Sequence, residues 1–105
     1  MKVGELMVRG TTPKLEFIIP FKVDIIKNLY ITFNQVGKNV LEKTEDDCSF
    51  EENIIVCHLT QADTLMLNDK NNVSIQLRVK TVDGESLAST IINESVKKVL
   101  KDGEI

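Results

Sequence analysis

Apolar and polar residues alternate without interruption from Val73 to Lys80. Because successive side chains of a β-strand point to opposite faces, this pattern predicts a strand with one buried and one solvated face. The Asp83-Gly84 dipeptide that follows is typical of a tight turn, so a return strand is expected over residues 86–92. The segment therefore predicts an antiparallel β-hairpin.

Shorter segments with the same two-residue period divide the rest of the chain into strands. The expected strands cover residues 15–19, 29–36, 40–44, 48–51, 54–59, 73–80 and 86–92. Residues 95–100 form either a last strand, which we favour, or a short helix, and residues 24–29 form either a helical turn or a loop. Thr60 with Asp63 three positions later is typical of a helix start, because the two side chains can bond each other's free amide groups.

Two loops set the pairing of neighbouring strands. Gly37-Lys38-Asn39 fits a three-residue hairpin loop, because Gly and Asn tolerate positive φ angles. Such a loop places Leu41 beside the face that carries Ile31 and Phe33.

The second loop is expected at Glu52-Asn53. In that register Cys48 lies opposite Cys57, and Phe50 lies opposite Ile55. The expected apolar face is Cys48, Phe50, Ile55, Cys57 and Leu59, and the other face carries Asp47, Ser49, Val56 and His58. A slip of one residue would exchange the two faces.

Seven or eight short strands with one short helical turn predict an all-β fold, an antiparallel immunoglobulin-like β-sandwich. A chain of 105 residues can bury one core, so we expect a single β-sandwich domain over residues 9–105. Residues 1–8 are expected to be a variable leader, in part ordered as an extra strand. The residues expected in the core are Phe17, Ile31, Phe33, Leu41, Ile55, Leu59, Ile75, Leu77 and Val79.

Charge and composition narrow the functional classes. The net charge is −3 and the 13 basic residues are interspersed among 16 acidic ones, whereas nucleic-acid-binding proteins gather Lys and Arg into patches. No apolar run approaches the ~20 residues that span a bilayer, and the N-terminus lacks the apolar stretch of a signal peptide. We therefore expect no nucleic-acid partner, no membrane, and synthesis in the cytoplasm.

His58 is the only histidine and hence the first candidate for a general base. In the expected register it faces Asp47, with the hydroxyls of Ser49 and Thr60 nearby. The sequence has neither the nucleophile elbow nor the Gly-rich oxyanion loop of a hydrolase. We expect no enzyme and no catalytic residue.

Cys48 and Cys57 allow two interpretations. Opposed residues could form a cross-strand disulfide, but their Cβ spacing of ~4.5–5.5 Å is long for that bond. We favour reduced, inward-facing thiols, as in most cytoplasmic proteins. Because two cysteines and one histidine do not supply the four ligands of a zinc site, no metal or other cofactor is expected.

Two clusters of charge remain. The acidic residues at one end of the domain are Glu42, Glu45, Asp46, Asp47, Glu51 and Glu52. They lack the spacing of a calcium-binding loop and are expected to form a solvated corner. Lys97, Lys98 and Lys101 are too few for nucleic acid and are expected to guard a strand edge.

A set of segments along the chain resembles one protein family. The segments are Arg9-Gly10-Thr11-Thr12-Pro13 with Phe17, Pro20 and Phe21; Ile31-Thr32-Phe33-Asn34-Gln35-Val36-Gly37; Val40-Leu41-Glu42-Lys43-Thr44 with Asp46-Asp47; Leu59-Thr60-Gln61-Ala62-Asp63-Thr64-Leu65; Val73-Ser74-Ile75-Gln76-Leu77-Arg78-Val79; and Leu87-Ala88-Ser89. Together they resemble a family of short uncharacterised proteins of phages and prophages of gut Firmicutes, usually encoded among tail and minor structural genes. The resemblance covers about Arg9 to Leu100. A looser similarity extends to the N-terminal β-sandwich of phage baseplate upper proteins.

The resemblance implies a structural or tail-assembly role and carries over no catalytic residue. The expected protein acts by protein–protein contact, with further copies of itself in a homo-oligomer or with a phage tail or baseplate protein. Exposed apolar residues such as Leu87 and Ile91 would suit that docking, and the protein would move from the cytoplasm to the virion on assembly. The alternative is a small peptide- or carbohydrate-binding module, which the lack of Trp and the single Tyr make the weaker hypothesis.

Overall fold

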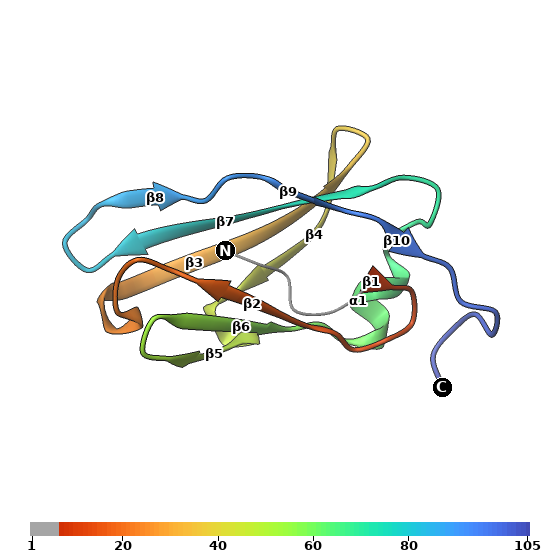
Figure 1. The fold of residues 1–105 in the computed structure, drawn as a ribbon, viewed down its shortest axis with the longest axis horizontal. Helices are drawn as coiled ribbons and strands as arrows, with labels where there is room; N and C mark the ends of the chain where they lie inside the picture. Colours follow the sequence, from red (N-terminus) through yellow and green to blue (C-terminus); the bar gives the residue numbers. More distant parts are fainter. Residues whose placement is uncertain (1–6) are drawn as a thin grey trace.

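The computed structural model describes residues 7–105 (Figure 1). The strands are β1 (Met7–Val8), β2 (Lys14–Ile18), β3 (Ile26–Gln35), β4 (Lys38–Thr44), β5 (Cys48–Glu51), β6 (Ile54–His58), β7 (Val73–Thr81), β8 (Ser86–Ala88), β9 (Ile92–Glu94) and β10 (Val96–Lys97). Two 3₁₀ turns, η1 (Val23–Ile25) and η2 (Glu45–Asp47), and one α-helix, α1 (Gln61–Leu65), connect them.

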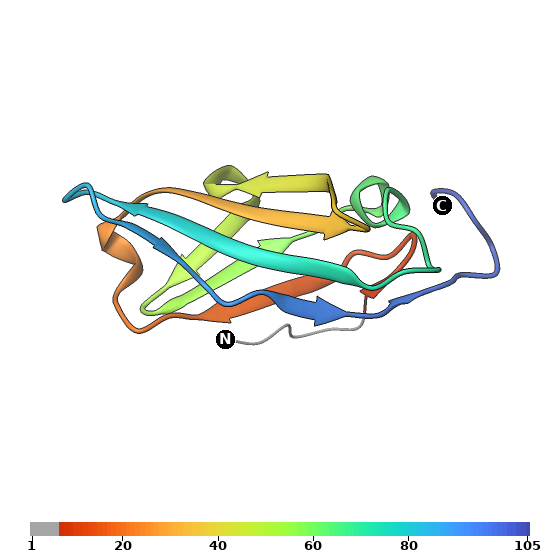
Figure 2. The ribbon, with the colours of Figure 1, turned by 90° about the horizontal axis from the view of Figure 1, so that it is seen from above.

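Two antiparallel sheets form the two layers of the fold (Figures 1 and 2). One sheet has the order β2-β6-β5, and the other has the order β4-β3-β7-β8, with β9 paired to the other end of β7. When β2, β3, β6 and β7 are equated with strands B, C, E and F of an immunoglobulin domain, these orders become B-E-D and C′-C-F-G. The predicted all-β, immunoglobulin-like sandwich is confirmed.

The core lies between the two sheets and follows the alternation in the sequence. The inward-facing residues of β7 pair with those of β3, for example Ile75 with Phe33 and Leu77 with Ile31. Every residue expected in the core is buried except Leu41, which is half-buried because β4 is an edge strand. The two-residue period therefore places the core residues correctly.

The β3–β4 loop is shorter than the sequence predicted. Gln35 pairs with Lys38, so the loop consists of Val36 and Gly37 and not of residues 37–39. Both loop residues have positive φ angles, 52° and 78°, as in the two-residue turns that suit the twist of a hairpin. A bulge at Val40 restores the parity, so Leu41 lies opposite Phe33 on the inner face as expected.

The β5–β6 hairpin has the predicted register. Cys48 pairs with Cys57 and Phe50 pairs with Ile55, around a loop of Glu52 and Asn53. One residue departs from the prediction: Phe50 is 39% exposed. Its strand is at the edge of the smaller sheet, and its side chain lines a hollow that is open to solvent.

The C-terminal part of the chain forms three strands where two were expected, and the extra strand expected near the N-terminus is present. The predicted strand over residues 86–92 is interrupted at residues 89–91, so β8 and β9 pair with β7 in registers that differ by one residue. The favoured last strand is present as β10, and it pairs in parallel with β1. Met7 and Val8, expected in the leader, form that extra strand, and Met7 is buried. The rest of the expected leader, residues 1–6, lies outside the described residues.

The two sides of the sandwich differ. On one side the chain passes directly from the edge strand β4 through η2 to the edge strand β5, which links the two sheets. On the other side the edges are β2 in one sheet and β8 with β9 in the other. We call this the open side, and it is bridged only at one end, by the β1–β10 pair, within the described part of the chain.

Candidate functional site

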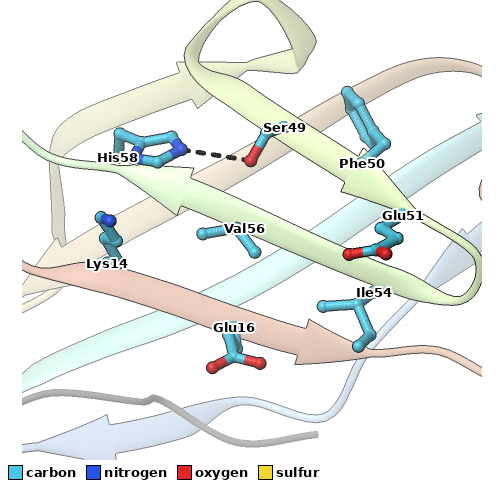
Figure 3. A pocket seen from close by; sticks show the side chains of 8 residues that line it. All are labelled: Lys14, Glu16, Ser49, Phe50, Glu51, Ile54, Val56 and His58. Atoms are coloured by element: carbon cyan, nitrogen blue, oxygen red, sulfur yellow. Dashed lines mark hydrogen bonds between the residues drawn. The ribbon is translucent and has the colours of Figure 1, made fainter.

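The outer face of the smaller sheet carries the side chains that are the first candidates for acid–base chemistry or ligand binding (Figure 3). In β2 and β6 the odd-numbered residues point into the core, so Lys14, Glu16 and His58 point outward. With side chains from β5 they line an open hollow of about 580 Å³. The alternation that builds the core thus also places the only histidine on a solvated surface.

Among residues 7–105, the His58 ring contacts a hydroxyl and no carboxylate. Its Nε2 lies 3.2 Å from the Oγ of Ser49, across the β5–β6 pair (Figure 3). The predicted Asp47–His58 pairing is wrong, because Asp47 belongs to η2. There its Oδ2 accepts a hydrogen bond from the Thr44 amide, and its Oδ1 lies 3.6 Å from Lys43 Nζ.

The Ser49–His58 pair therefore lacks the third member of a Ser–His–Asp triad. Both side chains are exposed, and the hollow around them is lined by Lys14, Glu16, Phe50, Glu51, Ile54 and Val56. Thr60, the other hydroxyl near His58 in the sequence, caps α1 instead: its Oγ1 accepts the Asp63 amide and its own amide donates to Asp63 Oδ2. The capping box predicted at this position is confirmed.

The two cysteines meet on the inner face of the β5–β6 hairpin as predicted. Cys57 is fully buried, Cys48 is half-buried, and both thiols are free. The adjacent Cys48 sulfur and burial raise the pKa of the Cys57 thiol well above its ordinary value. The Cys48 thiol is in hydrogen-bonding distance of the Thr44 carbonyl, at 3.4 Å. Cys57 thus stays a protonated, apolar core residue at neutral pH.

Next to the acidic corner, Lys43 and Asp63 form a largely buried ion pair that was not predicted from the sequence. Lys43 points inward from β4, is 8% exposed, and its Nζ lies 2.7 Å from Asp63 Oδ2. Burial alone would lower the pKa of Lys43 and raise that of Asp63. The bond between them and their opposite charges reverse both effects, so the Lys43 pKa is raised and the Asp63 pKa is lowered. The inward position of Lys43 could have been predicted from the sequence, because Lys43 is two residues from the inward-facing Leu41 in the same strand.

The acidic residues of the corner itself accept backbone amides or face solvent. Glu45 accepts the amide of Leu29 at 2.9 Å, and this bond lowers the pKa of its carboxyl. Among residues 7–105, no group of three or more His, Cys, Asp or Glu side chains is arranged to hold a metal ion.

The open side of the sandwich carries an apolar groove of about 220 Å³. Core residues from both sheets reach its surface there. The lining residues are Ile19, Pro20, Phe21, Leu77, Val79, Leu87, Ala88 and Ser89. Leu87, which the sequence analysis had singled out as uncovered, is 38% exposed at this groove, and Ile91 is 58% exposed further along the same edge.

A third, neutral hollow lies on the outer face of the larger sheet. It measures about 310 Å³ and is lined by Thr32, Asn34, Asn39, Ser74, Gln76 and Ile91. Hydrogen bonds fix several of these side chains: Asn34 Nδ2 donates to Asn39 Oδ1 at 2.9 Å, and Ser74 Oγ donates to Asn93 Oδ1 at 2.7 Å. The hollow thus presents preoriented, uncharged polar groups.

No protein-family model, curated protein or solved structure matches this chain. Over the residues that the structure describes, no helix is both long and apolar enough to cross a membrane.

Proposed function

We propose that this protein is a phage-derived structural or tail-assembly protein that acts by protein–protein contact. Its partners are further copies of the chain or a tail or baseplate protein, and it passes from the cytoplasm into the particle as the particle assembles. It has no cofactor and performs no catalysis. The phage origin rests on the sequence resemblance, and the mode of action rests on the surface.

The observation that carries the mode of action is the open side of the sandwich. An apolar groove reached by the core residues Leu77 and Val79 lies there beside a strand edge with exposed Leu87 and Ile91. Exposed apolar surface of this kind marks contact sites in proteins. The polar hollow around His58, by contrast, offers an exposed Ser–His contact that no carboxylate of the described residues orients.

The test is the composition of purified particles. In a culture of the source strain induced to release phage, quantitative mass spectrometry should find this chain in density-purified particles or tails at a fixed ratio to the other tail proteins. Particles that lack it, while the chain remains in the soluble lysate, would overturn the proposal. Particles from a strain with the gene deleted serve as the control.

A second candidate is a carbohydrate-binding module, favoured by the neutral hollow around Gln76. Amide groups both donate and accept hydrogen bonds, as sugar hydroxyls require. Binding of neutral oligosaccharides on a glycan array, lost in Gln76→Ala with the fold intact, would establish this function.

A further inference from the structure

The edge strand β8 and the segment that follows it, up to Asn93, are unusual for this chain because they carry no charge. From Ser86 to Asn93 there is no Asp, Glu, Lys or Arg, although 28% of the chain is charged. The other edge strands of the two main sheets carry charged residues: Lys14 and Glu16 on β2, Lys38 and Glu42 on β4, and Glu51 on β5. Proteins guard exposed edges with such charges, so their absence marks an edge that can accept another strand.

The backbone groups of β8 are arranged to receive that strand. The amide of Thr81 donates to Glu85, and the amide of Ser89 donates to Leu77. With Val79 opposite Leu87 between these two pairs, the ladder alternation directs the Leu87 amide and carbonyl to β7. The amides and carbonyls of Ser86 and Ala88 therefore point away from the sheet.

We infer that β8 is a two-fold interface at which two copies of this chain pair antiparallel, centred on Leu87. Ser86 of each copy then exchanges two hydrogen bonds with Ala88 of the other, giving four across the interface. The two Leu87 residues meet on the axis as a non-hydrogen-bonded pair, where Cα atoms are only ~4.5 Å apart. This inference rests on the proposed contact function and names its partner: a second copy.

The groove explains what the contact gains beyond four hydrogen bonds. The Leu87 side chain faces inward from β8 and lines the groove together with Leu77 and Val79. In the pair, the Leu87 of each copy packs against the other at the mouths of two adjacent grooves. Apolar surface that is exposed in the single chain is thereby removed from water.

Electrostatics also favour a second copy in this register. Glu85, the first charged residue beyond β8, comes opposite the uncharged Ser89 of the other copy. The nearest outward-facing cations, Arg78 and Lys80, are on β7. The main chains of the two β7 strands would be three strand spacings apart, about 14 Å, and each Arg78 guanidinium donates to Ser86 Oγ of its own β8 at 3.1 Å. No like-charged residues are directly opposed across the two β8 strands in this register.

The contact is small, because β8 has only three residues and the sheet edge is interrupted after it. Ser89 is held there by its own sheet, since its Oγ accepts the Leu77 amide and its carbonyl accepts Gln76 Nε2. Interfaces below about 1,200 Å² are typically weak. The pair should accordingly form at micromolar or higher concentrations and not persist on dilution.

The test uses two substitutions at Leu87 with matched controls at Leu100, which is 96% exposed and far from β8 in the chain. Leu87→Lys places two ammonium groups next to each other on the two-fold axis. The dissociation constant of the dimer, measured by light scattering, should rise at least ~10-fold. Leu100→Lys should leave the mass unchanged. Urea unfolding of both variants checks that the fold is retained, as expected for a partly exposed position.

The second substitution tests the geometry directly. In the proposed pair the two Cα atoms of residue 87 are ~4.5 Å apart, within the range that a disulfide spans. Oxidised glutathione should therefore convert Leu87→Cys rapidly to a cross-linked dimer. Leu100→Cys also contains the native Cys48 and Cys57, but its added thiol is outside the interface, so it should cross-link slowly. Equal rates for the two variants, or a mass unaffected by Leu87→Lys, would overturn the β8 interface and leave the proposed assembly function standing. That function instead fails if purified particles lack the chain.

Discussion

Replacement of Asp63 by Asn should destabilise the fold through the buried Lys43 ammonium. The substitution keeps the size of the side chain and an oxygen that can accept the Thr60 amide, so the helix cap survives. It removes the charge that lies 2.7 Å from Lys43 Nζ. The variant therefore tests the ion pair separately from the packing around it.

The magnitude follows from the geometry. At 2.7 Å and an effective dielectric constant of about 20, the attraction is about 6 kcal/mol, and desolvation of the two groups cancels much of it. Removing one partner of a fully buried pair costs ~3–5 kcal/mol. Because the pair is not fully buried and Asp47 remains 3.6 Å from Lys43, where it can replace part of the lost attraction, we expect a loss of about 2 kcal/mol, below that range.

The directions of the two pKa shifts determine how the stability lost in Asp63→Asn depends on pH. Folding lowers the pKa of Asp63. The ionised carboxylate therefore contributes fully to the free energy of unfolding above its ordinary pKa of 3.8, and this contribution is lost as the pH falls through the folded-state pKa. The Lys43 pKa is raised, so its contribution is complete below 10.5 and is lost as the pH rises through its folded-state value. The difference between wild type and Asp63→Asn should be constant between these limits and vanish in acid.

The assay is urea unfolding followed by circular dichroism, with free energies compared at pH 7 and at acidic pH. A loss of 2 kcal/mol corresponds to a midpoint roughly 1 M lower for a small domain. Asp69→Asn removes the same charge from an exposed loop and should change the free energy of unfolding by less than ~0.5 kcal/mol. A loss for Asp63→Asn that is as small as this, or that persists unchanged in acid, would refute the reasoning.

Three further substitutions or reactions test separate parts of the fold. Val36→Asn should stabilise the protein by about 1 kcal/mol, because a β-branched residue is held at a φ of 52° in a turn that favours Asn-Gly; a lower urea midpoint would contradict the turn assignment. Thr60→Ala should lose about 1 kcal/mol with the helix cap while Thr60→Ser loses little, and equal losses would show that the cap contributes nothing. Thiol titration of the denatured, unreduced chain should find both Cys48 and Cys57, with Cys57 slow to react in the native state; finding neither in a chain of monomeric mass would establish the disulfide.

Much of the fold followed from local patterns. The core of β3 and β7 was predictable because an alternating strand has only two faces, and one of them is continuously apolar. The β5–β6 register followed from the two-residue loop at Glu52-Asn53, and α1 followed from the Thr60–Asp63 box. In each of these cases the deciding interactions lie within a few residues of each other.

The failures came from interactions between distant segments. The β3–β4 loop was misplaced because Val at position 36 is a poor turn residue, and only the pairing of two long strands holds it at positive φ. Asp47 was assigned to His58 because the sequence does not show that η2 turns its carboxylate toward Lys43. The split between β8 and β9 depends on the bonds of Ser89 to Leu77 and Gln76, more than ten residues away.

The candidate contact surface was partly visible in the sequence. Leu87 and Ile91 stood out as apolar residues without a covering partner, and both are exposed. The groove beside them was not predictable, since residues 19–21 reach it from the other sheet. A surface made by two sheets becomes visible only when their relative placement is known.

The molar mass of the wild-type chain in solution tests most directly whether this domain works by contact between copies. Light scattering from micromolar to millimolar concentration should show a mass that rises from 11.8 kDa toward twice that value, with the transition moved to higher concentration in Leu87→Lys. A chain that stays at 11.8 kDa throughout the range would contradict the claim that its open side pairs with a second copy.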